Sequence, residues 1–138
     1  MRLVLRLPLA LRKAIVAQCV AALPNEGCGL LLGSREGRFA SVVEARPERN
    51  ILAASDRYEI EAEAVFAAHR AARAAGRQLL GAWHSHPASR AVPSATDLAQ
   101  AWPDWCYLIV GLSRPGRPEL RAWRLLGEDF VADQLEIE

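Results

Sequence analysis

Cysteine is scarce in this chain, and the way it is distributed excludes two classes of small protein. Three cysteines occur among 138 residues, at Cys19, Cys28 and Cys106, and no two of them form a C-x-x-C pair. An odd and dispersed set predicts neither a disulfide-stapled domain nor a cysteine-ligated zinc module. Such a set is typical of reduced thiols, so we expect a cytoplasmic protein.

The chain also lacks a large net charge and long apolar runs. The formal net charge is only +1, so charge predicts no nucleic-acid and no membrane partner. Arg6, Pro8 and Arg12 interrupt the apolar N-terminal segment. No stretch reaches the roughly 18 uncharged residues of a membrane span, and the pattern of a signal peptide is poor. We therefore expect neither a membrane segment nor a secretion signal.

Histidine is rare as well, but two of the three histidines, His84 and His86, stand one residue apart. The mostly apolar run 78–83 leads into them and predicts a buried strand. Residues i and i+2 of a strand face the same side, so both imidazoles can approach one metal while Ser85 faces the other way. Pro87 lacks an N–H and should end the strand.

A serine and an aspartate follow after a short loop. Ser94 is a good helix N-cap, and Asp97 lies three residues later, at N3. A helix start near the strand end would bring Asp97 to the metal as a third ligand, leaving a fourth position open as in catalytic zinc sites. The alternatives to a metal site are that the two histidines only form hydrogen bonds and that Ser94 and Asp97 only form a capping box. A metal-bound Asp97 would have less freedom to accept from the Ser94 backbone.

One carboxylate upstream completes a recognisable set. Glu26 lies between a predicted helix end and an apolar strand. Glu26, the run 84–87, Ser94 and Asp97 together resemble the motif of the JAMM (MPN-plus) metalloproteases, which is a Glu, then H-[ST]-H-P, a short spacer and S-x-x-D. The resemblance covers roughly residues 8–125, and all the chemical positions match. It implies a minimal prokaryotic-type zinc metallopeptidase.

The resemblance also implies a role for each residue. His84, His86 and Asp97 would bind Zn²⁺, which lowers the pKa of a bound water from about 15.7 toward about 7 and polarises a carbonyl. Glu26 would act as general acid/base, and Ser94 would help to hold the oxyanion. Cys28 is expected to be a small buried residue, with a thiol that senses or inhibits the metal as the alternative.

The substrate implied by the family is the amide bond after the Gly-Gly tail of a ubiquitin-fold protein. A sulfur carrier is preferred, and a ubiquitin-like modifier conjugated to lysines is the alternative. Because no long insertion is present, we expect an open site in which a partner or a homodimer orders the substrate. A non-catalytic zinc-binding interaction module and a small-molecule amidohydrolase stay open. Glu26 and Ser94 argue against the module, since neither is needed to hold zinc.

Hydrophobic periodicity predicts one α/β domain over residues 1–138, with a mixed sheet flanked by helices. The resemblance implies a JAMM/MPN, cytidine-deaminase-like architecture with the active site at a sheet end. Strands are expected over residues 1–6, 29–33, 39–45, 78–86, 106–112, 120–125 and 130–138, and helices over 9–23, 62–75 and 96–101. The segment 45–55 is expected to be a strand or a loop, and 58–60 a brief extended segment. Core packing is expected for the four tryptophans, Trp83, Trp102, Trp105 and Trp123.

Overall fold

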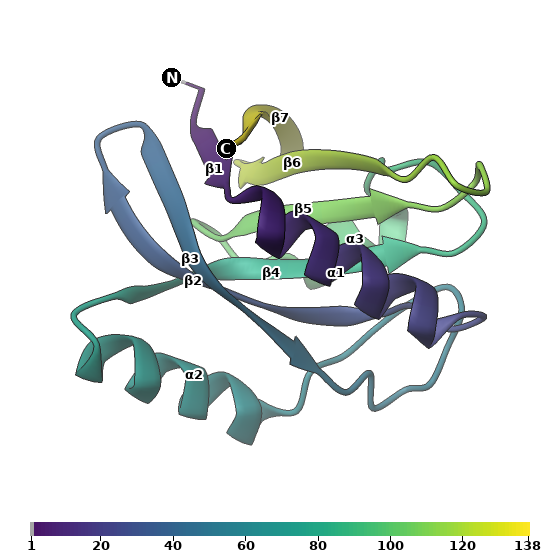
Figure 1. Ribbon diagram of the computed structural model, residues 1–138, viewed down its shortest axis with the longest axis horizontal. Coiled ribbons are helices and arrows are strands. Elements are labelled where there is room, and N and C mark those ends of the chain that lie inside the picture. Colours follow the sequence, from purple (N-terminus) through teal and green to yellow (C-terminus); the bar gives the residue numbers. More distant parts are fainter. Residues whose placement is uncertain (1) are drawn as a thin grey trace.

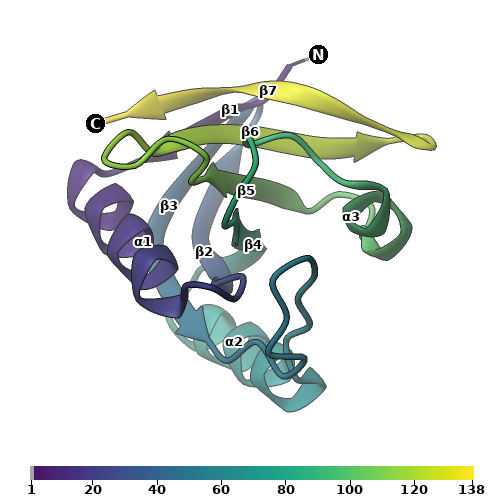
Figure 2. The same cartoon turned by 90° about the vertical axis from the view of Figure 1, so that its right-hand side faces the viewer.

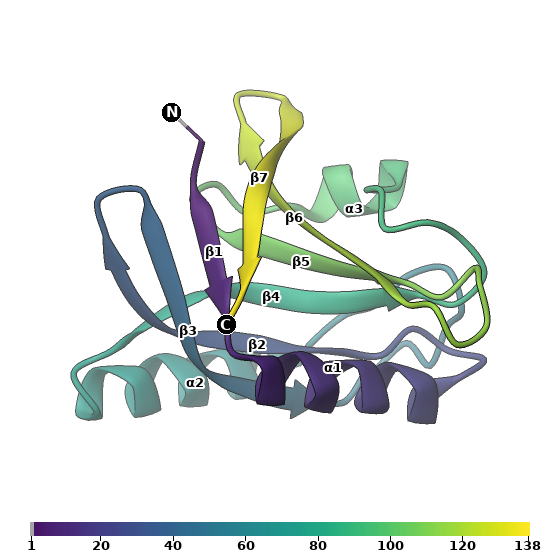
Figure 3. The same cartoon turned by 45° about the horizontal axis from the view of Figure 1, so that its top comes forward.

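A single mixed sheet organises the chain in the computed structural model, which describes residues 2–138 (Figure 1). The elements are β1 (Val4–Leu7), α1 (Leu9–Ala22), β2 (Cys28–Glu36), β3 (Phe39–Glu48), α2 (Ala62–Ala74), β4 (Gln78–His86), α3 (Ala95–Gln100), β5 (Cys106–Gly111), β6 (Glu119–Leu126) and β7 (Asp129–Ile137). The strand order is β1-β3-β2-β4-β5-β6-β7. β1 pairs in parallel with both β3 and β7, which brings the two ends of the sheet side by side (Figure 3).

Two cores form on the two faces of this sheet. α1 packs against β3 and β4, and its buried Ile15 and Cys19 join a core that includes Leu31 and Trp83. α2 packs against β2 and β4, and its small buried alanines join a second core around Leu30. Figure 2 shows the three helices set apart around the sheet. Each fully buried leucine contributes about 1.5–3 kcal/mol relative to an exposed one.

β4 is the strand that carries the predicted metal ligands, and it is buried over most of its length. It pairs antiparallel with β2 and parallel with β5. Its apolar residues contribute to both cores. Gly81 allows the close approach to β5, because a Cβ there would lie 1.8 Å from the Cys106 carbonyl oxygen. The position of β4 between two strands and two cores holds the histidines on a rigid element.

The predicted α/β class and mixed sheet are confirmed, and most boundaries agree within a few residues. β3 continues to Glu48, so the segment 45–55 divides into a strand end and a loop. Met1, at the start of the predicted first strand, lies outside the described residues. The prediction of one domain over 1–138 stays a prediction. Among residues 2–138, no helix has the length and apolar character needed to cross a membrane.

One packing prediction is wrong. Trp102 is 63% exposed, in the connection between α3 and β5. Trp83 is fully buried in the α1 core as expected, and Trp105 and Trp123 pack partly buried against the α2 core. Pro103 and the positive φ of Asp104 turn the chain directly after Trp102, and the ring stays mostly exposed at the rim of a groove that it lines with Val65 and Phe66 of α2.

Candidate metal centre

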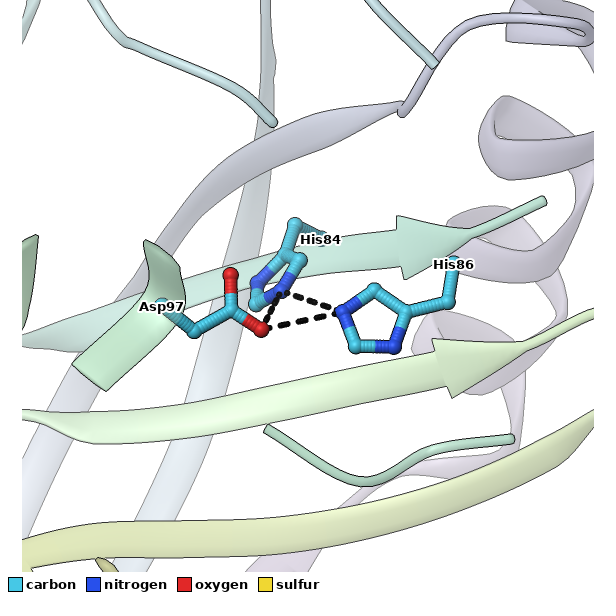
Figure 4. Close-up of side chains that lie close together, drawn as sticks. All are labelled: His84, His86 and Asp97. Carbon is cyan, nitrogen blue, oxygen red and sulfur yellow. Dashed lines mark hydrogen bonds and ion pairs between the residues drawn. The ribbon is translucent and has the colours of Figure 1, made fainter. Parts of the chain in front are cut away.

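The two histidines of β4 point to one place, as the strand period predicts (Figure 4). The Nε2 atoms of His84 and His86 lie 3.3 Å apart, and both side chains are buried. Ser85 faces the α1 side, where its Oγ accepts a hydrogen bond from the Gly27 N–H at 2.8 Å. The alternation of β4 therefore separates two imidazoles from the hydroxyl between them.

Asp97 reaches the same place from the first turn of α3. Its Oδ2 lies 3.0 Å from His86 Nε2 and 3.2 Å from His84 Nε2. The same oxygen accepts the Ser94 N–H at 2.9 Å, and Ser94 Oγ accepts the Asp97 N–H at 3.0 Å. The capping box and the convergence on the histidines thus coexist, although we expected them to compete.

The three converging atoms fit a metal ion. Among the described residues, His84, His86 and Asp97 form a group of buried ligands with atoms close enough to share one cation. Tetrahedral zinc at about 2.0–2.1 Å from each ligand requires ligand atoms about 3.3 Å apart. The observed separations of 3.0, 3.2 and 3.3 Å match the edges of one face of such a tetrahedron. The two imidazoles and one carboxylate are donors suited to zinc and similar divalent ions.

The charges at this centre are set by burial and by the contacts among the three side chains. Burial lowers the pKa of His84 and outweighs the opposing effect of Asp97. Burial also lowers the pKa of His86, but hydrogen bonds to Asp97 and to the Arg90 carbonyl raise it above its ordinary value. Burial raises the pKa of Asp97, yet the hydrogen bonds from both histidines hold it well below its usual range. His86 therefore keeps its proton to a higher pH than His84, and the carboxylate of Asp97 favours this protonated form.

Glu26 lies at the end of the sheet, in the loop before β2, and its side chain is only 3% exposed. Its backbone is held on both sides, because its N–H donates to the Ala54 carbonyl and its carbonyl accepts from Asn50 Nδ2. Its buried Oε1 has no hydrogen-bond partner among the described residues. Burial raises the pKa of Glu26 to about 8, with a lowering effect from His86 and a raising effect from Asp97. A carboxyl in this state can exchange a proton near neutral pH.

Cys28 behaves as the small buried residue expected at the start of β2. It is 2% exposed, and its Sγ lies 3.6 Å from the Glu48 carbonyl oxygen. Burial, followed by the charge of Glu48, raises the pKa of the Cys28 thiol to about 12. The sulfur therefore stays protonated and unreactive.

Tyr58 was not among the residues predicted at the site. Its ring stacks on His84 with the ring centroids 4.5 Å apart and an angle of 23° between the planes. It also lines a narrow cavity beside the metal centre together with His84, Asp97, Gln100 and Tyr107. The sequence predicts only a brief extended segment at 58–60, and a ring brought in by a loop leaves no periodic pattern.

Comparison with known proteins identifies the family. The model of the prokaryotic homologs of the JAB domain matches residues 8–126. The chain belongs to this family. A desampylase from Haloferax volcanii is 40% identical over 118 residues, which are 83% of this chain and 80% of that protein. A CysO-cysteine peptidase from Mycobacterium tuberculosis is 35% identical over 119 residues, 82% of this chain and 77% of that protein.

Solved structures agree with this assignment. A Desulfitobacterium hafniense protein superposes with a TM-score of 0.90 at 30% identity, covering 97% of this chain and 92% of that one. A JAB1/MPN domain protein from Archaeoglobus fulgidus superposes with a TM-score of 0.58 at 18% identity, covering 97% and 96%, and shows the fold alone. The JAMM/MPN resemblance and the expected fold are confirmed. Because the named relatives are a desampylase and a peptidase, the prediction of an enzyme is confirmed at the level of a JAB-type hydrolase.

Proposed function

We propose that this protein is a zinc-dependent metallopeptidase that hydrolyses the amide bond after the Gly-Gly tail of a ubiquitin-fold protein. The observation that carries the proposal is the convergence of His84 Nε2, His86 Nε2 and Asp97 Oδ2 within 3.3 Å of one another. Family membership supports the reaction class. The three side chains would hold zinc, which when bound supplies a water of pKa about 7 and polarises the scissile carbonyl.

Glu26 would be the general acid/base. Its carboxyl is buried, and Oε1 has no competing hydrogen-bond partner among the described residues. A cation held by the neighbouring ligands would lower the pKa of Glu26 from about 8 toward neutrality. The carboxylate would then accept a proton from the attacking water and pass it to the leaving amine, which is worth roughly a hundred- to ten-thousandfold in rate.

Ser94 would stabilise the developing oxyanion. Its Oγ already accepts the Asp97 N–H, so the orientation of this side chain is fixed by the start of α3. The hydroxyl hydrogen can still donate, and a donor aimed at developing negative charge is worth about 3–4 kcal/mol in related sites. The same residue thus caps the helix that supplies Asp97 and presents a hydrogen-bond donor beside it.

The narrow cavity beside the candidate metal centre supports a Gly-Gly tail on the substrate. The cavity beside His84 is narrow and lined by Tyr58 and Tyr107, so residues without side chains would pass where larger ones clash. We prefer a sulfur-carrier protein as substrate, and a relative named CysO-cysteine peptidase supports this choice. A relative named desampylase supports the alternative, in which a ubiquitin-like modifier is removed from lysines. We also propose a cytoplasmic location, which the three unpaired buried cysteines favour.

The experiment that tests the proposal offers two substrates to the zinc-loaded protein. One is a ubiquitin-fold sulfur carrier extended by a short peptide after Gly-Gly, and the other is the same carrier joined to a lysine side chain. Intact mass spectrometry reads the cleavage position. Faster cleavage of the peptide extension supports the sulfur-carrier reading, and faster cleavage of the lysine conjugate supports deconjugation. Cleavage of neither substrate by a preparation with confirmed zinc rejects the proposal.

A non-catalytic zinc-binding module is less well supported, because it has no need for an unpaired carboxyl buried at Glu26. Screening short amides beside the two carriers tests the remaining alternative, a small-molecule amidohydrolase. The requirement for a partner or a homodimer to order the substrate stays a prediction.

A further inference from the structure

One peptide group in the loop between β4 and α3 is held at both of its polar ends. The Arg90 carbonyl lies 3.0 Å from His86 Nδ1. On the other side of the same peptide, the Ala91 N–H donates to a Glu119 carboxylate oxygen at 3.0 Å. The chain His86–peptide–Glu119 therefore links a candidate metal ligand to a carboxylate on β6.

Two further contacts hold the residues on either side of this peptide, one at the carbonyl of the next peptide and one at the Arg90 side chain. Trp123 donates from its indole Nε1 to the Ala91 carbonyl at 3.0 Å, and the Arg90 guanidinium donates to Glu119 at 2.8 Å. Ala91 is fully buried against β5, where Gly111 leaves the necessary room. A Cβ at Gly111 would lie 2.6 Å from the Ala91 nitrogen. The backbone of this loop therefore packs closely against β5.

The direction of each hydrogen bond has a chemical consequence. A carbonyl oxygen only accepts, so Nδ1 of His86 carries the hydrogen in its contact with Arg90. When Nδ1 carries the hydrogen, Nε2 is the nitrogen that presents a lone pair to a metal beside Asp97. Hydrogen bonds in series polarise one another, so a carboxylate on the N–H of a peptide makes its carbonyl a stronger acceptor. The hydrogen bonds from Arg90 and Ala91 lower the pKa of Glu119 to about 2, and Glu119 is ionised at neutral pH.

We propose that Glu119 and Trp123 are positioning residues for His86. Glu119 acts through the Arg90–Ala91 peptide, which orients the His86 ring and selects its metal-binding nitrogen, and Trp123 supports this peptide by holding the next one at the Ala91 carbonyl. Partners of this kind commonly change metal affinity 10- to 100-fold when they are removed. The inference rests on the proposed function, in which His86 binds the metal. It differs from a direct carboxylate–histidine contact because a backbone amide stands between the two side chains.

The test compares full-length variants at Glu119 and Trp123 with a matched control. Glu119→Ala removes both bonds of the carboxylate, whereas Glu119→Gln keeps an oxygen that can accept the Ala91 N–H. Trp123→Phe removes the indole donor and keeps an aromatic ring. Glu136→Ala is the control, because Glu136 on β7 is also a partly exposed carboxylate paired with an arginine, at 3.4 Å from Arg6 Nε.

The first readout is the zinc dissociation constant, measured by competition with a chromophoric chelator. We expect Glu119→Ala to weaken binding by about 10- to 100-fold, with Glu119→Gln and Trp123→Phe in between and the control unchanged. The second readout needs no metal. At about pH 5, below the raised pKa of His86, its Nδ1–H signal should exchange with solvent at least about tenfold faster in Glu119→Ala than in the wild type.

Folded Glu119→Ala with the zinc affinity and the Nδ1–H exchange rate of the wild type overturns the inference. If Glu119→Ala does not fold, Glu119→Gln and Trp123→Phe decide the matter by the same two readouts. A wild type that binds no zinc rejects the proposed function, and the Nδ1–H exchange rate then still decides whether Glu119 and Trp123 hold His86.

Discussion

Replacing Ser85 by alanine should damage the site without touching a metal ligand. Ser85 is completely buried, and its Oγ accepts the Gly27 N–H at 2.8 Å, directly after Glu26. The backbone bond from the Ser85 N–H to the Gly27 carbonyl, 3.0 Å long, survives the substitution. Ser85→Ala therefore removes one of two hydrogen bonds that join Ser85 on β4 to Gly27, the residue after Glu26.

The structure sets the size of the effect. The Gly27 N–H is buried, and a buried donor left without an acceptor costs about 1–3 kcal/mol. For a chain of this length, each kcal/mol lowers Tm by about 3–4 °C, so we expect a loss of about 3–12 °C. A displacement of Glu26 by less than an ångström would reduce kcat by about 10- to 100-fold.

The assay measures three quantities on Ser85→Ala and on Ser113→Ala, which removes an exposed hydroxyl from the β5–β6 connection. These are Tm of the metal-free protein, zinc content and kcat for the Gly-Gly fusion. We expect Ser85→Ala to lose stability and turnover but to keep zinc, and Ser113→Ala to match the wild type in all three. Wild-type Tm and kcat in Ser85→Ala would refute the reasoning that this hydroxyl supports the Glu26 loop.

Three further predictions test the core, an ion pair and the protonation of the centre. Gly29→Ala should lower the unfolding free energy by about 3 kcal/mol, because a Cβ at this position would lie 2.3 Å from Trp83 and from the Arg46 carbonyl. Urea titration measures the loss, and an unchanged unfolding midpoint contradicts the prediction. Asp133→Ala should cost about 3–5 kcal/mol by the same titration, since it removes the buried acceptor of the Leu3 N–H and the carboxylate that pairs with Arg124. A loss below about 1 kcal/mol would show these contacts to be unimportant. In acidic solution, below the pKa values of both His86 and Glu26, the apparent zinc affinity should rise about tenfold per pH unit, and a slope of two protons there in chelator competition would be inconsistent with our assignment.

That last prediction follows from the direction of each pKa shift. His86 has a raised pKa, so its proton competes with the metal until the pH exceeds that value. His84 has a lowered pKa and therefore loses its proton at a lower pH than His86, and the pKa of Asp97 lies well below its usual range. In acidic solution, where Glu26 keeps its proton, the proton released on binding therefore comes from His86.

Much of the site could be predicted because its chemistry is local in the sequence. The strand period places His84 and His86 on one face, and the capping box fixes Asp97 one turn into α3. Both patterns depend on residues within a few positions of each other. The sequence could therefore predict which side chains converge and the helix that presents Asp97, while their role as metal ligands stays a prediction.

The parts that could not be predicted depend on contacts between distant segments. Tyr58 reaches His84 from a loop, and Glu119 reaches the Arg90–Ala91 peptide across 28 residues of chain. Neither carries a periodic pattern or a motif of its own. The exposure of Trp102 was mispredicted for a related reason, since large aromatics are usually buried and only the course of the α3–β5 connection leaves this one open.

The central claim is that the three converging side chains hold zinc for hydrolysis in which Glu26 moves the proton. The most direct measurement is intact mass spectrometry of a Gly-Gly-linked ubiquitin-fold fusion incubated with the zinc-loaded wild type and with zinc-loaded Glu26→Ala. The account predicts a cut after the second glycine by the wild type alone, with equal zinc in both proteins. Equal cleavage by Glu26→Ala, or an intact fusion with zinc-loaded wild type, would contradict it.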